Sequence, residues 1–175
     1  MESPDHGRRD VLRTLGAAAT LPALASVAGA QSTEQDGYGP LGRVEVPGTT
    51  EAVVSGDVAY LATTTGFATV DVSDPADPTV LADRRDLLAD REDGPLPQIY
   101  DVKVEGDRLL VAGPANQGRP TALVLYDVAD PADPARVSVY ETETANHNVY
   151  LEDGVAYRGN NYDAAGRNAL VMVDV

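Results

Sequence analysis

The sequence contains no cysteine, and this absence removes several kinds of chemistry at once. Without thiols the chain has no disulfide, no thiolate metal site, no nucleophilic cysteine and no cysteine for lipid attachment. Histidine is scarce as well, since only His6 and His147 occur. We expect His6 to be removed with an N-terminal leader, so a zinc centre built from several histidines is excluded within this chain.

Basic residues are few. The chain has 13 Lys and Arg against 28 Asp and Glu, which gives a formal net charge of −15, and Lys103 is its one lysine. Nucleic acids and anionic membrane surfaces bind basic patches, so neither is an expected partner. Because concentrated salt screens a dense acidic surface, this composition is typical of proteins from halophilic organisms.

The short motifs that mark common enzymes are also missing. The sequence has no Ser-His-Asp order, phosphate-binding loop, dinucleotide fingerprint or HExxH. We therefore assign no catalytic residue from the sequence, and the identity of any bound metal stays unknown.

The chain opens with a segment that is typical of an export signal, over residues 1–30. A polar, basic start is followed by an Ala/Leu-rich run over residues 11–28, and Ala28-Gly29-Ala30 supplies small residues for cleavage. The apolar run is short for a membrane span and contains Gly and Pro, so we expect no stable span in the mature chain.

The paired arginines Arg8 and Arg9 refine this prediction. Residues 7–13 (GRRDVLR) resemble the twin-arginine export signal, whereas the plainer interpretation is a generic basic leader. Either leader predicts a secreted or cell-surface protein. Residues 31–42 are polar and Gly-rich, and we expect them to form a flexible N-terminus of the mature chain.

Three segments of the remaining chain share one pattern, at about residues 50–86, 100–143 and 147–175. Each begins with an apolar run, a two-residue turn that contains Gly and an acidic residue, and a second apolar run, which together predict a β-hairpin. Repetition at this length, about 40 to 55 residues, points to propellers or solenoids before an ordinary domain.

Each unit continues with two more predicted strands. A near-continuous apolar run (residues 122–126 and 169–173) suits a strand buried on both faces. Asp-Pro-Ala-Asp-Pro then ends the strand, because proline donates no hydrogen bond, and a fourth run follows. Four strands a unit without an amphipathic helix predict an all-β fold, a β-propeller of four-stranded blades, over residues 43–175.

The predicted propeller is incomplete, with about two and two-thirds blades where rings hold about four to eight. An open stack leaves an apolar blade face and unpaired strand edges in water. We therefore expect either a fragment of a longer protein or self-association of copies. Arg43–Val46 could be the outer strand that closes the ring.

Parts of these units resemble a known family. Residues 70–78 (VDVSDPADP), 125–128 (LYDV) and 170–175 (LVMVDV) resemble the LVIVD repeat, and HNVY at 147–150 is similar to a motif of surface proteins called choice-of-anchor B. The resemblance covers roughly residues 44–175. It implies an exported β-propeller, and it is weak for function because the repeated residues are turn and core positions.

Aligning the units places Glu51, Asp101 and Asn148 at the start of the first strands, with Tyr100 matching His147. First strands line the central channel of a propeller, so we predict that Glu51, Asp101, His147 and Asn148 converge at its mouth. Such a ring could hold a cation or a small ligand. The alternative is that these side chains hydrogen-bond neighbouring blades or channel water.

The repeated aspartates leave two interpretations open. Clustered carboxylates are ligands for Ca²⁺, but the spacing lacks the features of an EF-hand, and the simpler role is to cap turns. The residues concerned are Asp71, Asp74, Asp77, Asp127, Asp130 and Asp133.

The function that the sequence favours is an exported binding or scaffold module for a protein or glycan at the cell surface. The alternative is a metal-dependent or lactonase-like hydrolase that uses the channel mouth, with His147 as an acid–base group.

Overall fold

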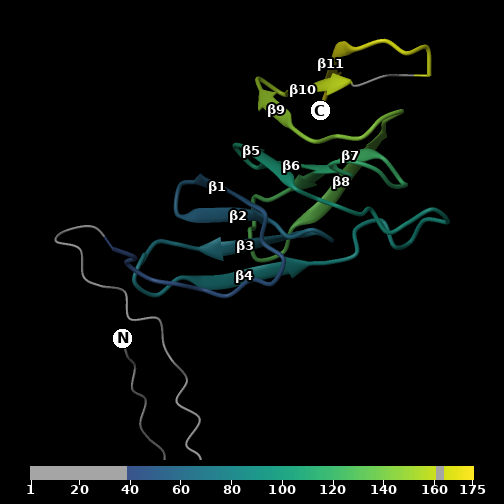
Figure 1. The fold of residues 1–175 in the computed structure, drawn as a ribbon. Coiled ribbons are helices and arrows are strands. Elements are labelled where there is room, and N and C mark those ends of the chain that lie inside the picture. Colours follow the sequence, from purple (N-terminus) through teal and green to yellow (C-terminus); the bar gives the residue numbers. More distant parts are fainter. Residues whose placement is uncertain (1–38, 161–163) are drawn as a thin grey trace, which may run out of the picture. The chain divides into compact units, whose positions relative to one another are not determined.

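The computed structural model describes residues 39–160 and 164–175 (Figure 1). The predicted leader, with Arg8, Arg9 and most of the 31–42 segment, lies outside the described residues. Within them, no helix has the length and apolarity that a membrane span requires. The regular elements of this part are strands, namely β1 (Glu51–Ser55), β2 (Val58–Ala62), β3 (Phe67–Asp71), β4 (Thr79–Arg84), β5 (Asp101–Glu105), β6 (Arg108–Gly113), β7 (Ala122–Asp127), β8 (Ala135–Glu141), β9 (Val149–Glu152), β10 (Val155–Asn160) and β11 (Ala169–Asp174).

The strands form three antiparallel sheets in chain order (Figure 1). The first has the order β1-β2-β3-β4, the second β5-β6-β7-β8, and the third holds β9, β10 and β11 with β10 in the centre. Each sheet is a meander, because every strand pairs with its neighbour along the chain. The fold-class prediction is confirmed: the chain is all-β, and its sheets of four, four and three strands resemble part of a β-propeller.

Two-residue turns set the register of the first hairpin in each sheet. Ser55 pairs with Val58, and Glu105 pairs with Arg108. Gly56 and Gly106 open these turns with φ of 59° and 54°, a backbone conformation that glycine adopts without steric cost. The hairpin turns therefore lie at the glycine-containing positions that the sequence pattern predicted.

The first two sheets pack face to face through large apolar side chains. Tyr60 and Phe67 of the first sheet meet Leu109, Val111 and Tyr126 of the second. The Phe67 and Tyr126 rings lie edge to face with centroids 4.8 Å apart, an arrangement that aromatic pairs favour.

The opposite face of the second sheet packs on the third in the same way. Its Leu110, Leu123 and Leu125 join Val149 and Val173 of the third sheet in one cluster. The second sheet is therefore covered on both faces, which explains its near-continuous apolar strands.

The outer face of the first sheet has a different cover. Ala59, Leu61 and Val70 lie beneath Val44 and Val46, which come from the segment before β1. Residues 43–46 have no strand partner in the described part of the chain, so the predicted closing strand is instead an irregular segment on this face.

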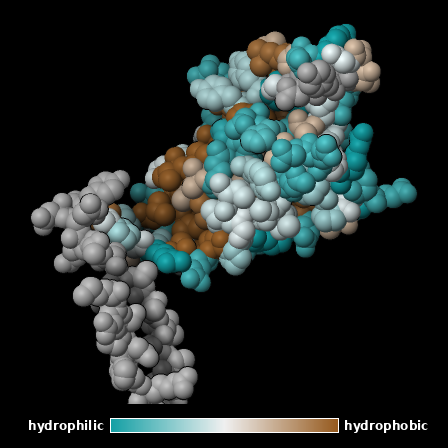
Figure 2. Space-filling model, viewed as in Figure 1, coloured by the Kyte–Doolittle hydropathy of each residue, from teal (hydrophilic) through white to brown (hydrophobic). Residues whose placement is uncertain are grey.

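The third sheet leaves large apolar side chains in contact with solvent. Tyr150, Leu170 and Met172 are 55%, 64% and 62% exposed. Figure 2 shows hydrophobic surface at the first and third sheets. A group of exposed apolar side chains on one surface often marks a site of interaction with another molecule.

The repeated Asp-Pro segments are hydrogen-bonded turns. Asp71 Oδ1 accepts the Ser73 N–H at 2.9 Å, and Asp74 Oδ1 accepts the Ala76 N–H at the same distance. Asp127 and Asp130 make the same two bonds, to Ala129 and Ala132. These aspartates act as the turn caps that the simpler interpretation gave them.

Candidate functional site

Two of the predicted site residues meet around the one lysine of the chain. Glu51 begins β1 and Asp101 begins β5, and both carboxylates accept hydrogen bonds from Lys103 Nζ. The Nζ–Oε1 distance to Glu51 is 2.9 Å, and the ammonium also donates to the Val102 carbonyl at 3.0 Å. The sequence analysis missed Lys103, although its rarity and its place two residues after Asp101 could have drawn attention to it.

Each of these carboxylates also accepts a hydrogen bond from the backbone of the next sheet along the chain. Glu51 Oε2 accepts the Val102 N–H at 2.8 Å, and Asp101 Oδ2 accepts the Val149 N–H. Both bonds run from the start of one sheet to the start of the next. The carboxylates thus hydrogen-bond a neighbouring blade, which is the structural alternative named for them above.

Burial and the neighbouring groups shift the pKa values of this cluster. Asp101 is 1% exposed, and burial, together with the carboxyl of Glu51, raises its pKa to about 6. Burial also opposes ionisation of Glu51, but hydrogen bonds with Asp101, Val102 and Lys103 outweigh it and lower the pKa of Glu51. The two carboxylates raise the pKa of Lys103 against the effect of burial. Burial between the sheets thus makes Asp101 the carboxyl of the pair that protonates more readily.

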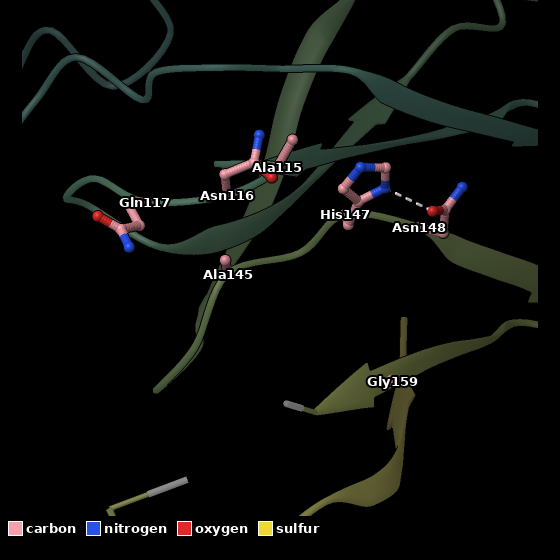
Figure 3. A pocket seen from close by; sticks show the side chains of 7 residues that line it. All are labelled: Ala115, Asn116, Gln117, Ala145, His147, Asn148 and Gly159. Carbon is pink, nitrogen blue, oxygen red and sulfur yellow. Dashed lines mark hydrogen bonds between the residues drawn. The ribbon is translucent and has the colours of Figure 1, made fainter. Parts of the chain in front are cut away.

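The other two predicted residues, His147 and Asn148, line a separate pocket of about 660 Å³ (Figure 3). His147 Nδ1 lies 2.6 Å from Asn148 Oδ1. The rest of the lining comes from the β6–β7 loop, the β8–β9 connection and β10, namely Ala115, Asn116, Gln117, Ala145 and Gly159.

A buried polar pair, Asn146 and Arg158, supports one wall of this pocket. Arg158 Nε donates to Asn146 Oδ1 at 2.7 Å, and its Nη2 donates to Thr144 Oγ1 at 2.7 Å. Asn146 Nδ2 donates in turn to the Gly113 carbonyl and to Thr142 Oγ1, both at 2.9 Å. Burial lowers the pKa of Arg158, whose hydrogen-bond acceptors are neutral groups. The pair ties the β8–β9 connection to the end of β6.

The facing wall, which carries Asn116 and Gln117, is fixed to the segment before β5. The Ala115 N–H donates to the Gln98 carbonyl at 2.9 Å, and the Asn116 N–H donates to Gln98 Oε1 at 3.2 Å. The β6–β7 loop is thereby held against the segment that precedes the second sheet.

The arrangement offers neutral hydrogen-bonding groups. Asn116, Gln117 and Asn148 each carry both donors and acceptors, and His147 adds an imidazole. Within residues 39–160 and 164–175, no three His, Cys, Asp or Glu side chains are grouped so that they could hold a metal ion. Of the four residues predicted to meet, Glu51 and Asp101 share Lys103, whereas His147 and Asn148 line the pocket, and Asp101 accepts the N–H of Val149, the residue after Asn148.

Comparisons with known proteins address the fold. A model of the LVIVD repeat matches residues 48–83, which hold the first sheet apart from the last residue of β4. A search of curated proteins finds no match. Among solved structures, the chain is similar to the N-terminal domain of Nup159, with a TM-score of 0.42 and 10% sequence identity. The match covers 75% of this chain and 32% of that one, so the chain spans about a third of the length of that domain.

Proposed function

We propose that this protein is an exported, non-catalytic binding module, and that the pocket between the second and third sheets binds a neutral carbohydrate. The observation that carries the proposal is the lining itself: three carboxamide side chains and one imidazole gather from two separate segments, the β6–β7 loop and the β8–β9 connection. The LVIVD match supports a repeat module and does not specify a ligand.

The chemistry of the lining favours hydroxyl groups. A carboxamide both donates and accepts, as a sugar hydroxyl does, so each can satisfy the other on binding. The net charge of −15 disfavours anionic ligands by long-range repulsion. A neutral glycan fits both conditions, and the cell surface is where such a ligand would meet an exported protein.

The pocket is also held in shape before any ligand arrives. Asn146 and Arg158 fix one wall and Gln98 fixes the other, so binding orders few new groups. Preorganisation of this kind lowers the entropic cost of association.

Binding of neutral oligosaccharides to the purified protein, measured by saturation-transfer NMR and titration calorimetry, tests the proposal. We expect the double variant Asn116→Ala/Gln117→Ala to weaken binding by about tenfold or more, since each lost pair of hydrogen bonds costs on the order of 1 kcal/mol. Ser55→Ala is the matched control, because Ser55 is exposed at the end of β1 in the first sheet, whereas the pocket lies between the second and third sheets. Equal binding by wild type and double variant, or binding in neither, would reject the proposed ligand site.

Export is a separate part of the proposal and has its own test. Replacing Arg8 and Arg9 by lysine should retain the protein in the producing cell if the twin-arginine route carries it. Immunoblots of cells and medium measure the effect, and unchanged secretion of the double variant would point to a generic leader instead.

A further inference from the structure

We infer that Asp101 controls one wall of the pocket through its state of protonation. The wall consists of His147 and Asn148 and is called the histidine wall below. Ionised Asp101 holds this wall in place, and protonated Asp101 releases it. The consequence for ligand affinity rests on the proposed function, whereas the release of the wall does not.

The histidine wall is a two-residue segment with an anchor at each end. Before it, the Asn146 N–H donates to the Pro114 carbonyl at 2.7 Å, and the Asn146 side chain is buried. After it, the Val149 N–H donates to Asp101 Oδ2. The two wall residues themselves are exposed at the pocket (Figure 3). Their position therefore depends on the anchors on either side.

Only one of these anchors depends on a group that titrates near neutral pH. Asn146 Nδ2 donates to the Gly113 carbonyl and the Thr142 hydroxyl, and its Oδ1 accepts from the guanidinium of Arg158, which stays charged. The anchor at Val149 depends on a carboxyl. Hydrogen bonds to an ionised acceptor are about twice as strong as those to a neutral one, so a proton on Asp101 weakens this anchor alone.

The surroundings of Asp101 make it the carboxyl that takes up the proton. Asp101 and Glu51 share one ammonium, that of Lys103. The Asp101 side chain is 1% exposed and that of Glu51 is 31% exposed, so water stabilises the charge of Glu51 more. Among the strands packed on Asp101, β6 places Ala112 opposite it, and β9 presents the Val149 N–H. On the side of β9, the histidine wall contributes an imidazole. The pKa of about 6 given above for Asp101 agrees with this geometry.

The two protonation states of Asp101 make different demands on the third sheet. A buried carboxylate that loses a hydrogen-bond partner incurs a large desolvation cost, so ionised Asp101 keeps the Val149 N–H close. A neutral carboxyl does not impose this cost, and the histidine wall then gains freedom relative to Asn116 and Gln117 across the pocket. A ligand that bridges the two sides therefore binds more tightly at neutral than at mildly acidic pH. By linkage, its binding releases a proton from Asp101.

Amide hydrogen exchange of the ligand-free protein, followed by NMR from about pH 5 to about pH 7.5, tests the release of the wall. Protection factors remove the pH dependence of the exchange chemistry itself, because each rate is compared with the rate of an unstructured chain at the same pH. We expect the protection of the Val149 N–H to fall about fivefold from the upper to the lower pH, with a midpoint near pH 6.

The Val102 N–H is a matched control within the same molecule. Its acceptor is the carboxylate of Glu51, so this bond also joins one sheet to the start of the next. Hydrogen bonds with Asp101, Val102 and Lys103 lower the pKa of Glu51 against the effect of burial. Glu51 therefore stays ionised, and the protection of the Val102 N–H should be constant over this pH range.

Three variants identify the titrating group. Asp101→Asn should make the protection of the Val149 N–H independent of pH, whereas His147→Gln should retain the fall. If Asp101→Asn does not fold, Lys103→Gln provides the test, because it removes the cation that favours ionised Asp101 and should move the midpoint to higher pH. Constant protection in the wild type, a fall that persists in Asp101→Asn or disappears in His147→Gln, or an unmoved midpoint in Lys103→Gln would overturn the inference.

Titration calorimetry with maltotriose, a neutral trisaccharide, tests the consequence for binding. We expect the wild type to bind about fivefold more tightly at about pH 7.5 than at about pH 5, and Asp101→Asn to bind equally at both. Equal affinity of the wild type at both pH values would overturn the control of binding by Asp101. If maltotriose binds at neither pH while the protection of the Val149 N–H still falls, the proposed ligand is wrong and the release of the wall is supported.

Discussion

Asp101 is the residue whose chemistry the fold changes most. Its carboxylate is buried between two sheets, where it accepts bonds from Lys103 and from the Val149 N–H. Sequence alignment of the repeats found its position and that of Glu51, because both open a first strand. The burial and the lysine were not predictable, since they depend on how adjacent sheets are rotated against each other.

We predict that Asp101 makes stability fall as pH rises through about 6. Its folded pKa is about 6 and its ordinary value is 3.8, so the folded state binds the proton more tightly. The resulting stabilisation is complete below about pH 4 and is lost above pH 6, a change of at most about 3 kcal/mol at about 1.4 kcal/mol per pH unit. Urea unfolding from pH 4 to 7 measures it.

Asp101→Asn is the variant that isolates this effect. The carboxamide keeps an acceptor for the Val149 N–H but does not titrate, so its stability should decline less over the same range. Asp107→Asn, in an exposed hairpin turn, should follow the wild type. Parallel curves for wild type and Asp101→Asn would show that Asp101 is not the titrating group.

Asn146 is the second residue whose role only the structure reveals. We expect Asn146→Ala to lower the free energy of unfolding by about 2–3 kcal/mol, because it leaves Arg158 Nε and the Gly113 carbonyl without this partner. Asn148→Ala removes a carboxamide of the same size from an exposed position and should cost about 0.5 kcal/mol or less. Chemical denaturation of both variants makes the comparison.

At the scale of elements, turn chemistry and apolar runs were reliable guides. Gly56 and Gly106 lie in two-residue hairpin turns, and the Asp-Pro segments end β3 and β7 as the sequence indicated. The segment between β4 and β5 carries no strand pattern, yet its Leu87, Leu88 and Leu96 are buried in the core that the first two sheets share. Its polar, proline-containing sequence concealed this, because periodicity is informative only within regular elements.

Leu96→Ala tests the structural role of that segment. Leu96 is fully buried, so the substitution should destabilise the protein by about 2–5 kcal/mol through lost burial and a residual cavity. Leu41→Ala, at a position 78% exposed, is the matched control and should be nearly neutral. Thermal or urea unfolding measures both, and equal stability of the two variants would contradict the assignment of Leu96 to the core.

For the whole molecule, the net charge of −15 predicts that stability depends on the salt concentration. Many of the 28 acidic side chains repel one another at low ionic strength, while the ion pairs Arg84–Asp133 and Arg136–Asp90 connect the first two sheets and the segment between them. The propeller-like order of sheets was predictable because each repeat carries its own turn and strand signals. The contacts that the predicted site residues make, with Lys103 and in the pocket, were not predictable, because they depend on the paths of loops.

We predict that the melting temperature rises with KCl concentration from about 0.1 M to 2 M. Screening weakens repulsion within the acidic surface more than it weakens its few ion pairs, since the Debye length falls from about 10 Å to about 3 Å at 1 M. Scanning calorimetry measures the shift, and an equal mass of glycerol controls for general exclusion of cosolvent. A melting temperature that is flat or falls with salt would contradict this interpretation of the composition.

The bonds in which a carboxylate of one sheet accepts a backbone N–H of the next share one direction along the chain. Glu51 holds the Val102 N–H, Asp101 holds the Val149 N–H, and Glu105 accepts the N–H groups of Asp153 and Gly154. In each case the earlier sheet supplies the acceptor and the later sheet supplies the backbone donor. During synthesis on the ribosome the first and second sheets therefore already carry the acceptors for the sheet that emerges next, and assembly can proceed stepwise without waiting for distant segments.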